Sequence, residues 1–458
     1  MTTDTAFDLI ILGGGPAGSR AALRAAGLGL KTALVESGFL GGACLNSGCI
    51  PTKYLLGASA GLPLLRKQIR YKTAHGGMHL DFAALQSRKD RYVKGTRKAL
   101  QKRLEQAGVR IFKGKGVFSG PDAVTVRGSG LEAELSFAKC IVAIGSAPAS
   151  YPGLKPDGAT VHSPAGLLGL RAVPQSLLIV GGGAIGLELG ELFHRFGCAI
   201  ILAEAAPRLL PREDPEVGAT LHAHYRRAGW AIHTGRRIQS LSTVNGRSLL
   251  RFEDGGELTA AASLLCVGRK PMASAIAPEA AALPLKPGGW LDTDDCLRCT
   301  ENIYAVGDVN GRLLLANAAD DQGRYAVDHA AGVTGAPYPG PLVPSCIYSG
   351  MEYMRVGPTA DELRAGGEEV FQSRADLAAN PVAQSSGYPR GFVKMLWTNE
   401  ELRSVYGIGL NVAHVLTPAS LLVNGRTQKN MPLPLISAYP ALDEVLESAM
   451  LGQLESIG

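Results

Sequence analysis

The sequence has no uninterrupted apolar run of about 18 residues, the length that a membrane-spanning helix requires. Its N-terminus, MTTDTAFDLIILGGG, lacks the basic segment and the small-residue cleavage site of a secretory signal. Aromatic residues make up only 6% of the chain and charged residues 19%, and the net charge is +6. We therefore predict a cytoplasmic globular protein whose partners include neither a membrane nor a nucleic acid.

Basic residues are locally dense in residues 86–114, as they also are on nucleic-acid-binding surfaces. The lysines and arginines of this stretch surround Leu100, Leu104 and Val109, a pattern typical of a helix with one buried face. A modest charge excess says little about partners. We interpret the stretch as the solvated face of a helix.

Cysteine is too sparse for a disulfide scaffold, since the chain has eight among 458 residues. A long chain without a secretory signal is expected in the cytosol, where thiols stay reduced unless a disulfide is catalytic. We therefore expect one or two special cysteines. The eight are Cys44, Cys49, Cys140, Cys198, Cys266, Cys296, Cys299 and Cys346.

Glycine is abundant, with 58 residues, and two of its loops belong to an internal repeat. An apolar run, FDLIIL, is followed by a turn beginning at Gly13, a helical stretch and a second run ending in Glu36. The same order returns with LLIV, a turn beginning at Gly181, a helical stretch and a run ending in Glu204. The distance from first glycine to acid is 23 residues in both copies.

Each copy has the pattern of a dinucleotide-binding unit. The first glycine makes the tight turn, the second lets the backbone approach a pyrophosphate, and the third lets the helix pack on the strand. The helix N-terminus then presents free N–H groups to the phosphates, and the acid accepts a hydrogen bond from a ribose. The two sites predicted in this way use Gly13, Gly15, Gly18 and Glu36, and Gly181, Gly183, Gly186 and Glu204.

The second acid also bears on the choice of nicotinamide cofactor. The carboxylate of Glu204 suits a free 2′-hydroxyl and repels a 2′-phosphate, which favours NAD. Arg208 and Arg212 follow closely, and a nearby arginine can accommodate NADP. NAD is therefore the prediction and NADP stays open.

Two cysteines lie between the first acid and a long helical region, in GGACLNSGCIPTK. If the segment enters a helix near Cys44, a modest bend brings the sulfur of Cys49 within bonding reach. A helix N-terminus also lowers the pKa of a thiol and so favours the nucleophilic thiolate. We predict that Cys44 and Cys49 form a redox-active pair.

The segment CLNSGCIPTK resembles the active site of the class I pyridine nucleotide–disulfide oxidoreductases, and the resemblance extends along almost the whole chain. Dihydrolipoamide dehydrogenases are the members with the most similar pattern. Other motifs that resemble the family are IVAIGSAP, GGGAIGLELG, LLCVGRKP, NIYAVGDV, LLLANAADDQGRYA and VPSCIYSGMEYMRVG.

The resemblance implies an α/β fold with two doubly wound Rossmann-like domains and an α+β dimerisation domain. The FAD-binding domain would comprise residues 1–147 and 271–340, the NAD(P)-binding domain residues 148–270, and the dimerisation domain residues 341–458. It also implies a homodimer that acts on a small-molecule or protein-bound disulfide or dithiol. The cofactors implied are FAD and NAD, and no metal.

The resemblance assigns roles to individual residues. Cys49 would be the flavin-side thiol, Cys44 the thiol that attacks substrate, and Lys53 would lie beside the flavin and pair with Glu188. The first glycine turn would hold FAD and the second the nicotinamide cofactor. Further FAD-binding residues would be Gly145, Gly268 and Asp308.

The sequence departs from the family near the C-terminus, where the catalytic histidine is expected. The stretch AYPALDE places Tyr439 at the histidine position and keeps Glu444, and both would face Cys44 of the partner chain in the homodimer. A tyrosine, with an ordinary pKa of about 10, is a poor base at neutral pH, so we expect weak oxidation of dihydrolipoamide. His414 is an alternative base, although NVAHVLTPAS resembles a strand and turn of the dimerisation domain.

Two other features leave alternatives open. Cys296 and Cys299 could form a metal site or a second redox pair, but we interpret them as structural residues in a strand before NIYAVGD. The family's Tyr-Thr-x-Pro-Glu is altered to a segment running from Tyr348 to Glu352.

We therefore predict an FAD-dependent NAD(H):disulfide or dithiol oxidoreductase, with electrons passing from NADH through FAD and the cysteine pair. The missing histidine keeps a second hypothesis open, an NADH-dependent reductase of metal ions, quinones or oxygen. A third is a flavin-binding structural or sensing subunit, against which the intact cysteine pair, Lys53 and Glu188 argue.

Overall fold

The computed structural model describes residues 5–128, 130–340, 342–386, 389–429, 431 and 435–457. The chain forms two compact units, each assembled from three segments. The first comprises Met1–Leu55, Ala83–Ala149 and Val267–Pro339, and the second Leu56–Phe82, Ser150–Cys266 and Gly340–Gly458. The domain boundaries expected from the sequence stay a prediction.

The first unit is built on a seven-stranded sheet in the order β3-β2-β1-β6-β5-β4, with β17 also paired to β6. β1, β2, β3, β6 and β17 pair in parallel, whereas β4 and β5 extend the sheet in antiparallel fashion. Two short strands, β7 and β16, pair separately. The bounds are β1 Ala6–Leu12, β2 Thr32–Glu36, β3 Arg110–Lys113, β4 Lys115–Gly120, β5 Ala123–Gly128, β6 Leu131–Val142, β7 Ser146–Pro148, β16 Arg269–Pro271 and β17 Ile303–Ala305.

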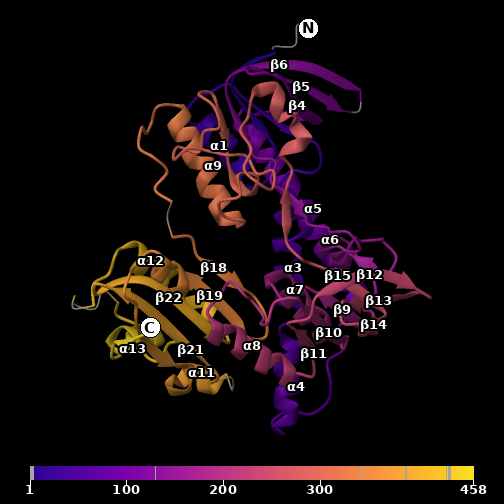
Figure 1. The fold of residues 1–458 in the computed structure, drawn as a ribbon, viewed down its shortest axis with the longest axis vertical. Helices are drawn as coiled ribbons and strands as arrows, with labels where there is room; N and C mark the ends of the chain where they lie inside the picture. The colour runs from indigo at the N-terminus through magenta and orange to yellow at the C-terminus, as the bar shows by residue number, and fades with distance from the viewer. Residues whose placement is uncertain are drawn as a thin grey trace. The chain divides into compact units, whose positions relative to one another are not determined.

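Helices cover one face of this sheet, and α1 and α9 lie side by side there (Figure 1). Leu9 and Ile11 of β1 pack on the face that α1 and α9 cover, and Ile10 and Leu12 on the other. Because both faces are buried, β1 is almost continuously apolar, as in parallel sheets generally. The helices are α1 Pro16–Gly27, α2 Gly42–Ser47, α3 Cys49–Ala58, α5 Phe82–Gln106 and α9 Ala316–Ala330, with 3₁₀ turns η1 Ala273–Ile276, η2 Pro278–Ala281 and η3 Gly307–Asn310.

The basic stretch forms the predicted helix. It falls largely on α5, where Leu104 is fully buried and most of the lysines and arginines are exposed. This placement confirms our interpretation of the stretch as a helix with a solvated face.

The second unit contains a parallel sheet in the order β11-β10-β9-β15-β8 and an antiparallel three-stranded sheet, β12-β13-β14. α7 follows β9 and α8 follows β10, which repeats the strand–turn–helix order of the first unit. The bounds are β8 Val161–His162, β9 Ser176–Val180, β10 Ala199–Glu204, β11 Ala231–Thr234, β12 Ile238–Val244, β13 Arg247–Phe252, β14 Glu257–Ala260, β15 Ala262–Leu265, α4 Gly61–Arg70, α6 Pro164–Leu168, α7 Ala184–Arg195 and α8 Pro215–Arg227.

The C-terminal part of the second unit is a six-stranded antiparallel sheet in the order β18-β19-β22-β21-β20-β23. Trp397 and Met395 of β21 lie in its fully buried core. The bounds are β18 Ser345–Ile347, β19 Glu352–Val356, β20 Phe371–Asp376, β21 Gly391–Thr398, β22 Glu401–Gly409, β23 Glu455–Ser456, α10 Ala360–Ala365, α11 Pro381–Ser385, α12 Leu416–Asn424, α13 Glu444–Leu451, η4 Leu377–Ala379 and η5 Val412–Val415.

The mixed sheet of the first unit and the parallel sheet of the second, each with its helices, and the antiparallel C-terminal sheet confirm the predicted fold class. Over the described part of the chain, no helix combines the length and the apolar character needed to cross a membrane.

Two local expectations were wrong. The segment around His414 is not a strand and turn but the 3₁₀ turn η5 followed by α12, because Asn411 adopts a left-handed conformation (φ 63°) and a helix starts behind it. Cys296 and Cys299 lie in a turn rather than a strand, since the Asp294 side chain accepts the N–H of Cys296 at 2.8 Å and that of Arg298 at 2.9 Å.

Candidate active site

The first glycine turn joins β1 to α1 and needs glycine for two separate reasons. Gly13 has a φ of 100°, in the region that side chains rarely adopt. A Cβ on Gly18 would lie 1.8 Å from the Gly13 carbonyl oxygen, so only glycine lets the helix begin this close to the strand. At Gly15 the space is open, since the nearest atom would lie 3.9 Å from a Cβ there.

The carboxylate of Glu36 closes this turn from the end of β2. One oxygen accepts the N–H of Gly14 at 2.7 Å and the other accepts the N–H of Gly38 at 2.6 Å. These bonds hold the acid beside the glycine turn, where the sequence predicted it.

Asp308 lies in a polar network that joins distant parts of the first unit. Ser146 donates to the Asp308 carboxylate at 2.5 Å, and Arg269 approaches both residues, at 2.6 Å from Ser146 Oγ and 3.4 Å from Asp308. Ser146 and Arg269 belong to the paired strands β7 and β16, which Gly145 and Gly268 precede. Asp308 and these two glycines are therefore brought into one neighbourhood, and their contact with FAD stays a prediction.

The two cysteines are joined across a break between two short helices. Cys44 lies in α2, Cys49 is the first residue of α3, and Gly48 between them leaves the helical conformation with φ −138° and ψ −109°. The side chains of Cys44 and Cys49 hydrogen-bond to each other. The predicted bend is confirmed.

The electrostatics of the pair follow from this contact. The hydrogen bond with Cys49, together with burial, raises the pKa of the Cys44 thiol. The positive charge of Lys53, one turn along α3 from Cys49, acts in the opposite direction. Lys53 thus stands where it favours a thiolate in the pair.

The loop that leads into Cys44 is held by the amide of Asn46. Its Nδ2 donates to the carbonyls of Leu40 at 2.9 Å and Gly42 at 2.8 Å, and its Oδ1 accepts from Arg97 of α5 at 3.0 Å. A single asparagine therefore orients the start of α2 against α5.

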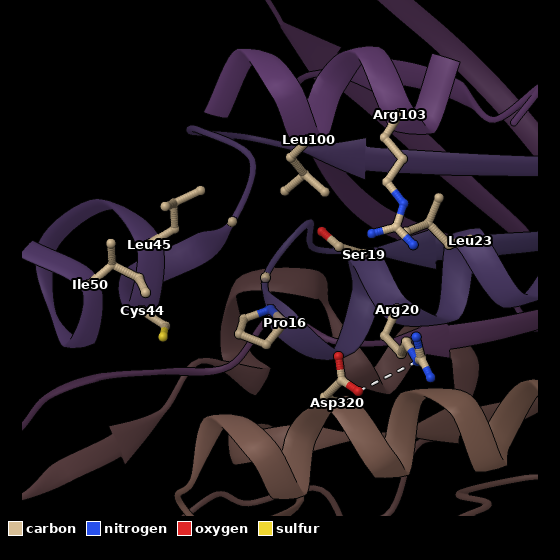
Figure 2. Close-up of a pocket in the computed structure, with 12 residues that line it drawn as sticks. Pro16, Ser19, Arg20, Leu23, Cys44, Leu45, Ile50, Leu100, Arg103 and Asp320 are labelled. Atoms are coloured by element: carbon tan, nitrogen blue, oxygen red, sulfur yellow. Dashed lines mark ion pairs between the residues drawn. The ribbon is translucent and has the colours of Figure 1, made fainter. Parts of the chain in front are cut away.

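A cavity of about 240 Å³ opens beside Cys44 and the first glycine turn (Figure 2). Gly15 and Pro16 of the turn contribute to its wall, and so do helices α1, α5 and α9. Sequence reasoning missed the charged residues of this wall. Arg20 could have been noticed because it follows the turn directly, and Asp320 because it lies in the motif LLLANAADDQGRYA, but Arg103 carries no local motif.

The second glycine turn, in the second unit, repeats the geometry of the first. Gly181 has a φ of 116°, and a Cβ on Gly186 would lie 2.3 Å from the Gly181 carbonyl oxygen. Glu204 accepts the N–H of Gly182 at 2.6 Å and that of Ala206 at 2.7 Å. Gly183 faces open space.

The residues around this second turn define its surroundings. The Cys266 thiol lies under the turn and donates to the carbonyls of Val180 and Gly181 at 3.3 and 3.4 Å. Burial raises the pKa of Cys266, which suits a structural thiol. Arg208 donates to the Pro211 carbonyl at 2.9 Å within its own loop, and Arg212 is exposed.

Glu188, on α7 one turn beyond this glycine turn, is nearly buried. Its carboxylate accepts the backbone N–H of Tyr348 at 2.9 Å, so the altered Tyr348–Glu352 segment contacts α7 directly. Burial raises the pKa of Tyr348 to about 12. Lys53 belongs to the first unit and Glu188 to the second, and their pairing stays a prediction.

At the C-terminal stretch, Tyr439 is 85% exposed, and over the described residues its side chain makes no hydrogen bond. Glu444, the first residue of α13, accepts the N–H of Ala441 at 2.6 Å. His414 lies near Glu352, whose pKa burial raises. The roles of Tyr439, Glu444 and His414 stay predictions.

The second cysteine pair has two different surroundings. Cys296 hydrogen-bonds with the Tyr325 side chain, whereas Cys299 packs against the apolar core and burial raises its pKa to about 12. In the described residues, no three His, Cys, Asp or Glu side chains gather in a metal-binding arrangement.

Both glycine turns fit a dinucleotide. Each presents an open face at its middle glycine, the start of a helix of twelve residues and a carboxylate fixed by two backbone N–H groups. These are the features that bind a pyrophosphate and an adjoining ribose.

Comparison with known proteins agrees with this geometry. Residues 7–323 match the family described as pyridine nucleotide-disulphide oxidoreductase, and residues 343–450 match the dimerisation domain of the same family. A dihydrolipoyl dehydrogenase of Bacillus subtilis is 34% identical over 466 residues, which cover 98% of each chain. That of Chlorobaculum parvum is 31% identical over 460 residues, which cover 99% of this chain and 98% of the relative.

Solved structures give the same result. LpdA from Mycobacterium tuberculosis superposes with a TM-score of 0.89 at 25% identity, covering 97% of this chain and 99% of that one. The Cu(II) complex of the HOCl-induced flavoprotein disulfide reductase RclA from Escherichia coli superposes with a TM-score of 0.86 at 25% identity and the same coverage. With both parts of the chain matched and relatives that align over nearly their full length, this protein belongs to the pyridine nucleotide-disulphide oxidoreductases, enzymes that use FAD and NAD(H).

Proposed function

We propose that this protein passes electrons from NADH to a disulfide substrate through Cys44 and Cys49. The observation that carries the proposal is the contact of the two thiols at the break between α2 and α3, with Cys44 also lining a cavity beside the first glycine turn. A thiol that touches both its redox partner and a cavity can exchange disulfides with a ligand in that cavity.

The first unit would hold FAD. Gly13, Gly15 and Gly18 with the α1 N-terminus would receive its pyrophosphate and Glu36 a ribose, while Asp308 would contact the chain that leads to the flavin. Bound FAD supplies the two-electron chemistry that links a nicotinamide to a disulfide. Gly181, Gly183, Gly186 and Glu204 of the second unit would hold NAD(H) in the same manner.

The thiol steps are a pair of disulfide exchanges. The Cys44 thiolate attacks one sulfur of the substrate, so that a Cys44–substrate bond forms while the substrate S–S bond breaks and one thiolate leaves and takes a proton. The Cys49 thiolate then attacks Cys44, restoring the Cys44–Cys49 disulfide and releasing the second thiolate, which takes another proton. NADH supplies both electrons and one proton, and solvent supplies the other.

Two charged residues would support these steps. The hydrogen bond with Cys49 and burial raise the pKa of Cys44, and the positive charge of Lys53 opposes this rise and would so favour the thiolate. Glu188, held by the Tyr348 N–H, would neutralise Lys53 as the family resemblance implies. In the implied homodimer, Tyr439 and Glu444 of one subunit would face Cys44 of the other.

Differential alkylation of the holoenzyme tests the electron path. We expect iodoacetamide to leave Cys44 and Cys49 unmodified in the oxidised enzyme and to label both after anaerobic addition of NADH, as mass spectrometry would show. Cys44→Ser should abolish disulfide reduction while leaving NADH consumption with ferricyanide intact. The double variant Cys296→Ser, Cys299→Ser is the matched control. A Cys44→Ser enzyme that still reduces disulfides would refute the proposal.

A reductase of a non-disulfide acceptor is the second candidate. Tyr439 favours it, because a tyrosine at the expected histidine position is a poor base for a substrate thiol. The structural relative RclA was solved in complex with Cu(II), which makes Cu(II) a reasonable acceptor to assay. NADH-dependent reduction of Cu(II) that persists in Cys44→Ser would favour a route without the cysteine pair.

The substitution Tyr439→His separates the two candidates. We expect it to raise dihydrolipoamide oxidation by about 10²–10⁴-fold, the usual contribution of a general acid–base. Tyr439→Phe is the control and should leave that activity low. Unchanged activity in Tyr439→His would mean that another residue serves as the base or that dithiols are not the substrate.

A further inference from the structure

The cavity beside Cys44 is lined by both aliphatic and charged side chains. Its volume is about 240 Å³ and all the residues that line it belong to the first unit. Leu23, Leu45, Ile50 and Leu100 supply the aliphatic surface. A ligand that reaches Cys44 through this space therefore meets apolar contacts suited to an alkyl chain.

The ionisable groups of the lining, apart from Cys44, are Arg20, Arg103 and Asp320. Arg20 and Asp320 form an ion pair at 3.5 Å, with about half of each side chain exposed. Arg103 has no ion-pair partner among the described residues. The cavity therefore carries one uncompensated positive charge, and its carrier is a guanidinium that can bind a carboxylate with two hydrogen bonds.

The arrangement of these groups separates the thiol from the cations. Figure 2 shows Cys44 on one side of the cavity and Arg20 and Arg103 on the other, with Pro16 and Ser19 between them. Arg103 reaches from α5 toward α1, so this exposed side chain lies at the edge of the cavity (Figure 2). A disulfide at Cys44 would thus extend an alkyl chain toward a cationic end.

We propose that the substrate of Cys44 is a small disulfide that carries a carboxylate, and that Arg103 binds this carboxylate. The inference rests on the proposed disulfide function and adds the chemical class of its substrate. Asp320 weakens the preference for a carboxylate because it neutralises Arg20. Arg103 and Asp320 therefore set the strength of this preference together. Arg103 acts as a specificity-determining residue and does not take part in the thiol exchange.

Lipoate and lipoamide give a matched test, because they share a dithiolane ring and a pentanoyl chain and differ only in carboxylate against amide. With the FAD-loaded enzyme and NADH, we expect kcat/KM to be about tenfold higher for lipoate at low salt, the size of one hydrogen bond to a charged group. The preference should shrink with added salt, because the arginines are solvent-exposed.

Variants assign the preference to residues. Arg103→Ala should lower kcat/KM for lipoate about tenfold and leave kcat/KM for lipoamide unchanged. Asp320→Asn should raise kcat/KM for lipoate severalfold. Arg91→Ala is the matched control, since Arg91 is an exposed arginine of the same helix that does not line the cavity. Arg91→Ala should change kcat/KM for neither substrate.

Each other outcome has a defined meaning. Equal kcat/KM values for lipoate and lipoamide would overturn the proposed substrate class. An equal change of both values in Arg103→Ala would do the same. Both outcomes would leave the proposed disulfide function standing. Loss of bound FAD in Arg103→Ala overturns it too, because the arginine would then belong to the cofactor site. If neither disulfide is reduced, the disulfide function fails. Calorimetric binding of lipoate to the oxidised enzyme, with and without Arg103→Ala, then decides whether the carboxylate site exists.

Discussion

The two glycine turns of this chain have almost the same internal geometry. In both, the first glycine has a φ near the middle of the left-handed range, at 100° for Gly13 and 116° for Gly181. In both, the acid at the end of the next strand accepts two backbone N–H groups at 2.6–2.7 Å. The shared geometry explains why both copies are recognisable as dinucleotide sites.

The segments that follow the acids are different. After Glu36 the chain turns into α2 and α3, which carry Cys44 and Cys49 beside a cavity. After Glu204 it runs into an acidic stretch that the C-terminal sheet holds by ion pairs. Tyr353 and Arg355 contact Glu213 at 2.6 and 2.8 Å.

The same acidic stretch continues into α8. Lys394 of β21 is 6% exposed and contacts Asp214 at 3.0 Å and Glu216 at 2.9 Å, and Arg374 also binds Glu216. The comparison teaches that the glycine turn only holds a dinucleotide. The segment after the acid decides what the turn adjoins, two contacting cysteines in the first unit and the C-terminal sheet in the second.

The largest effect is expected from adding a methyl group where the helix packs against each glycine turn. Gly18→Ala and Gly186→Ala place a Cβ 1.8 and 2.3 Å from a carbonyl oxygen, so the backbone must shift. We expect Gly18→Ala to lose bound FAD and Gly186→Ala to keep FAD but raise the KM for NADH more than about tenfold. Gly95→Ala, where no atom lies within 4 Å, is the control. Identical phenotypes for the two variants would mean that the copies do not serve different cofactors.

The next effect tests the clamp after the second turn. Lys394→Met leaves Asp214 and Glu216 without their buried cation and should lower the free energy of unfolding by about 3–5 kcal/mol. Arg251→Met breaks an exposed pair with Glu257 and should cost about 1 kcal/mol or less. Urea unfolding followed by circular dichroism measures both. Similar losses in the two variants would contradict a buried clamp.

A smaller effect separates the two acids. Glu204→Gln keeps the shape of the side chain but weakens its hydrogen bonds, so we expect the KM for NADH to rise roughly tenfold and discrimination against NADPH to fall. Glu36→Gln should weaken FAD binding and leave the KM for NADH unchanged. Steady-state kinetics with added FAD distinguishes them, and a rise in the KM for NADH in Glu36→Gln would contradict the assignment.

The smallest effect is a pH dependence of the clamp. Burial acts to raise the pKa of Glu216, but hydrogen bonds from Lys394 and Arg374 outweigh it and hold the pKa below its ordinary value. A lowered pKa adds stability that is present above the ordinary carboxyl range and is lost as the pH falls through it. Between about pH 6 and pH 3 the wild type should lose up to about 1 kcal/mol more than Glu216→Gln, because the carboxylate is partly screened. A parallel pH dependence in the two proteins would exclude this contribution.

Local patterns explain what the sequence predicted well. Each glycine turn is a contiguous strand, turn and helix, so its spacing can be read without tertiary information. The bend between Cys44 and Cys49 follows from Gly48 in the same way. The prediction failed at Cys296 and around His414, where the Asp294 side chain and the left-handed Asn411 redirect the backbone.

The cavity shows the opposite situation. Arg103 and Asp320 come from α5 and α9, helices far apart in the sequence that meet beside α1 only in the folded unit. Arg103 belongs to no motif, and the motif LLLANAADDQGRYA that contains Asp320 does not assign it to the cavity, because a charge on a helix surface has the same pattern whether it faces solvent or a ligand. Its position could not be foreseen from spacing.

The sequence by itself determined the family, the two glycine turns and the contact of Cys44 with Cys49, since each depends on residues within a few turns of chain. Only the tertiary structure decided which charges line the cavity beside Cys44 and which acids the C-terminal sheet holds. The physical reason is the distance along the chain over which each feature is determined. A glycine turn or a helix break is set by backbone conformation over a few residues, whereas a charge acquires a role only from the groups that the fold brings within a few ångströms of it.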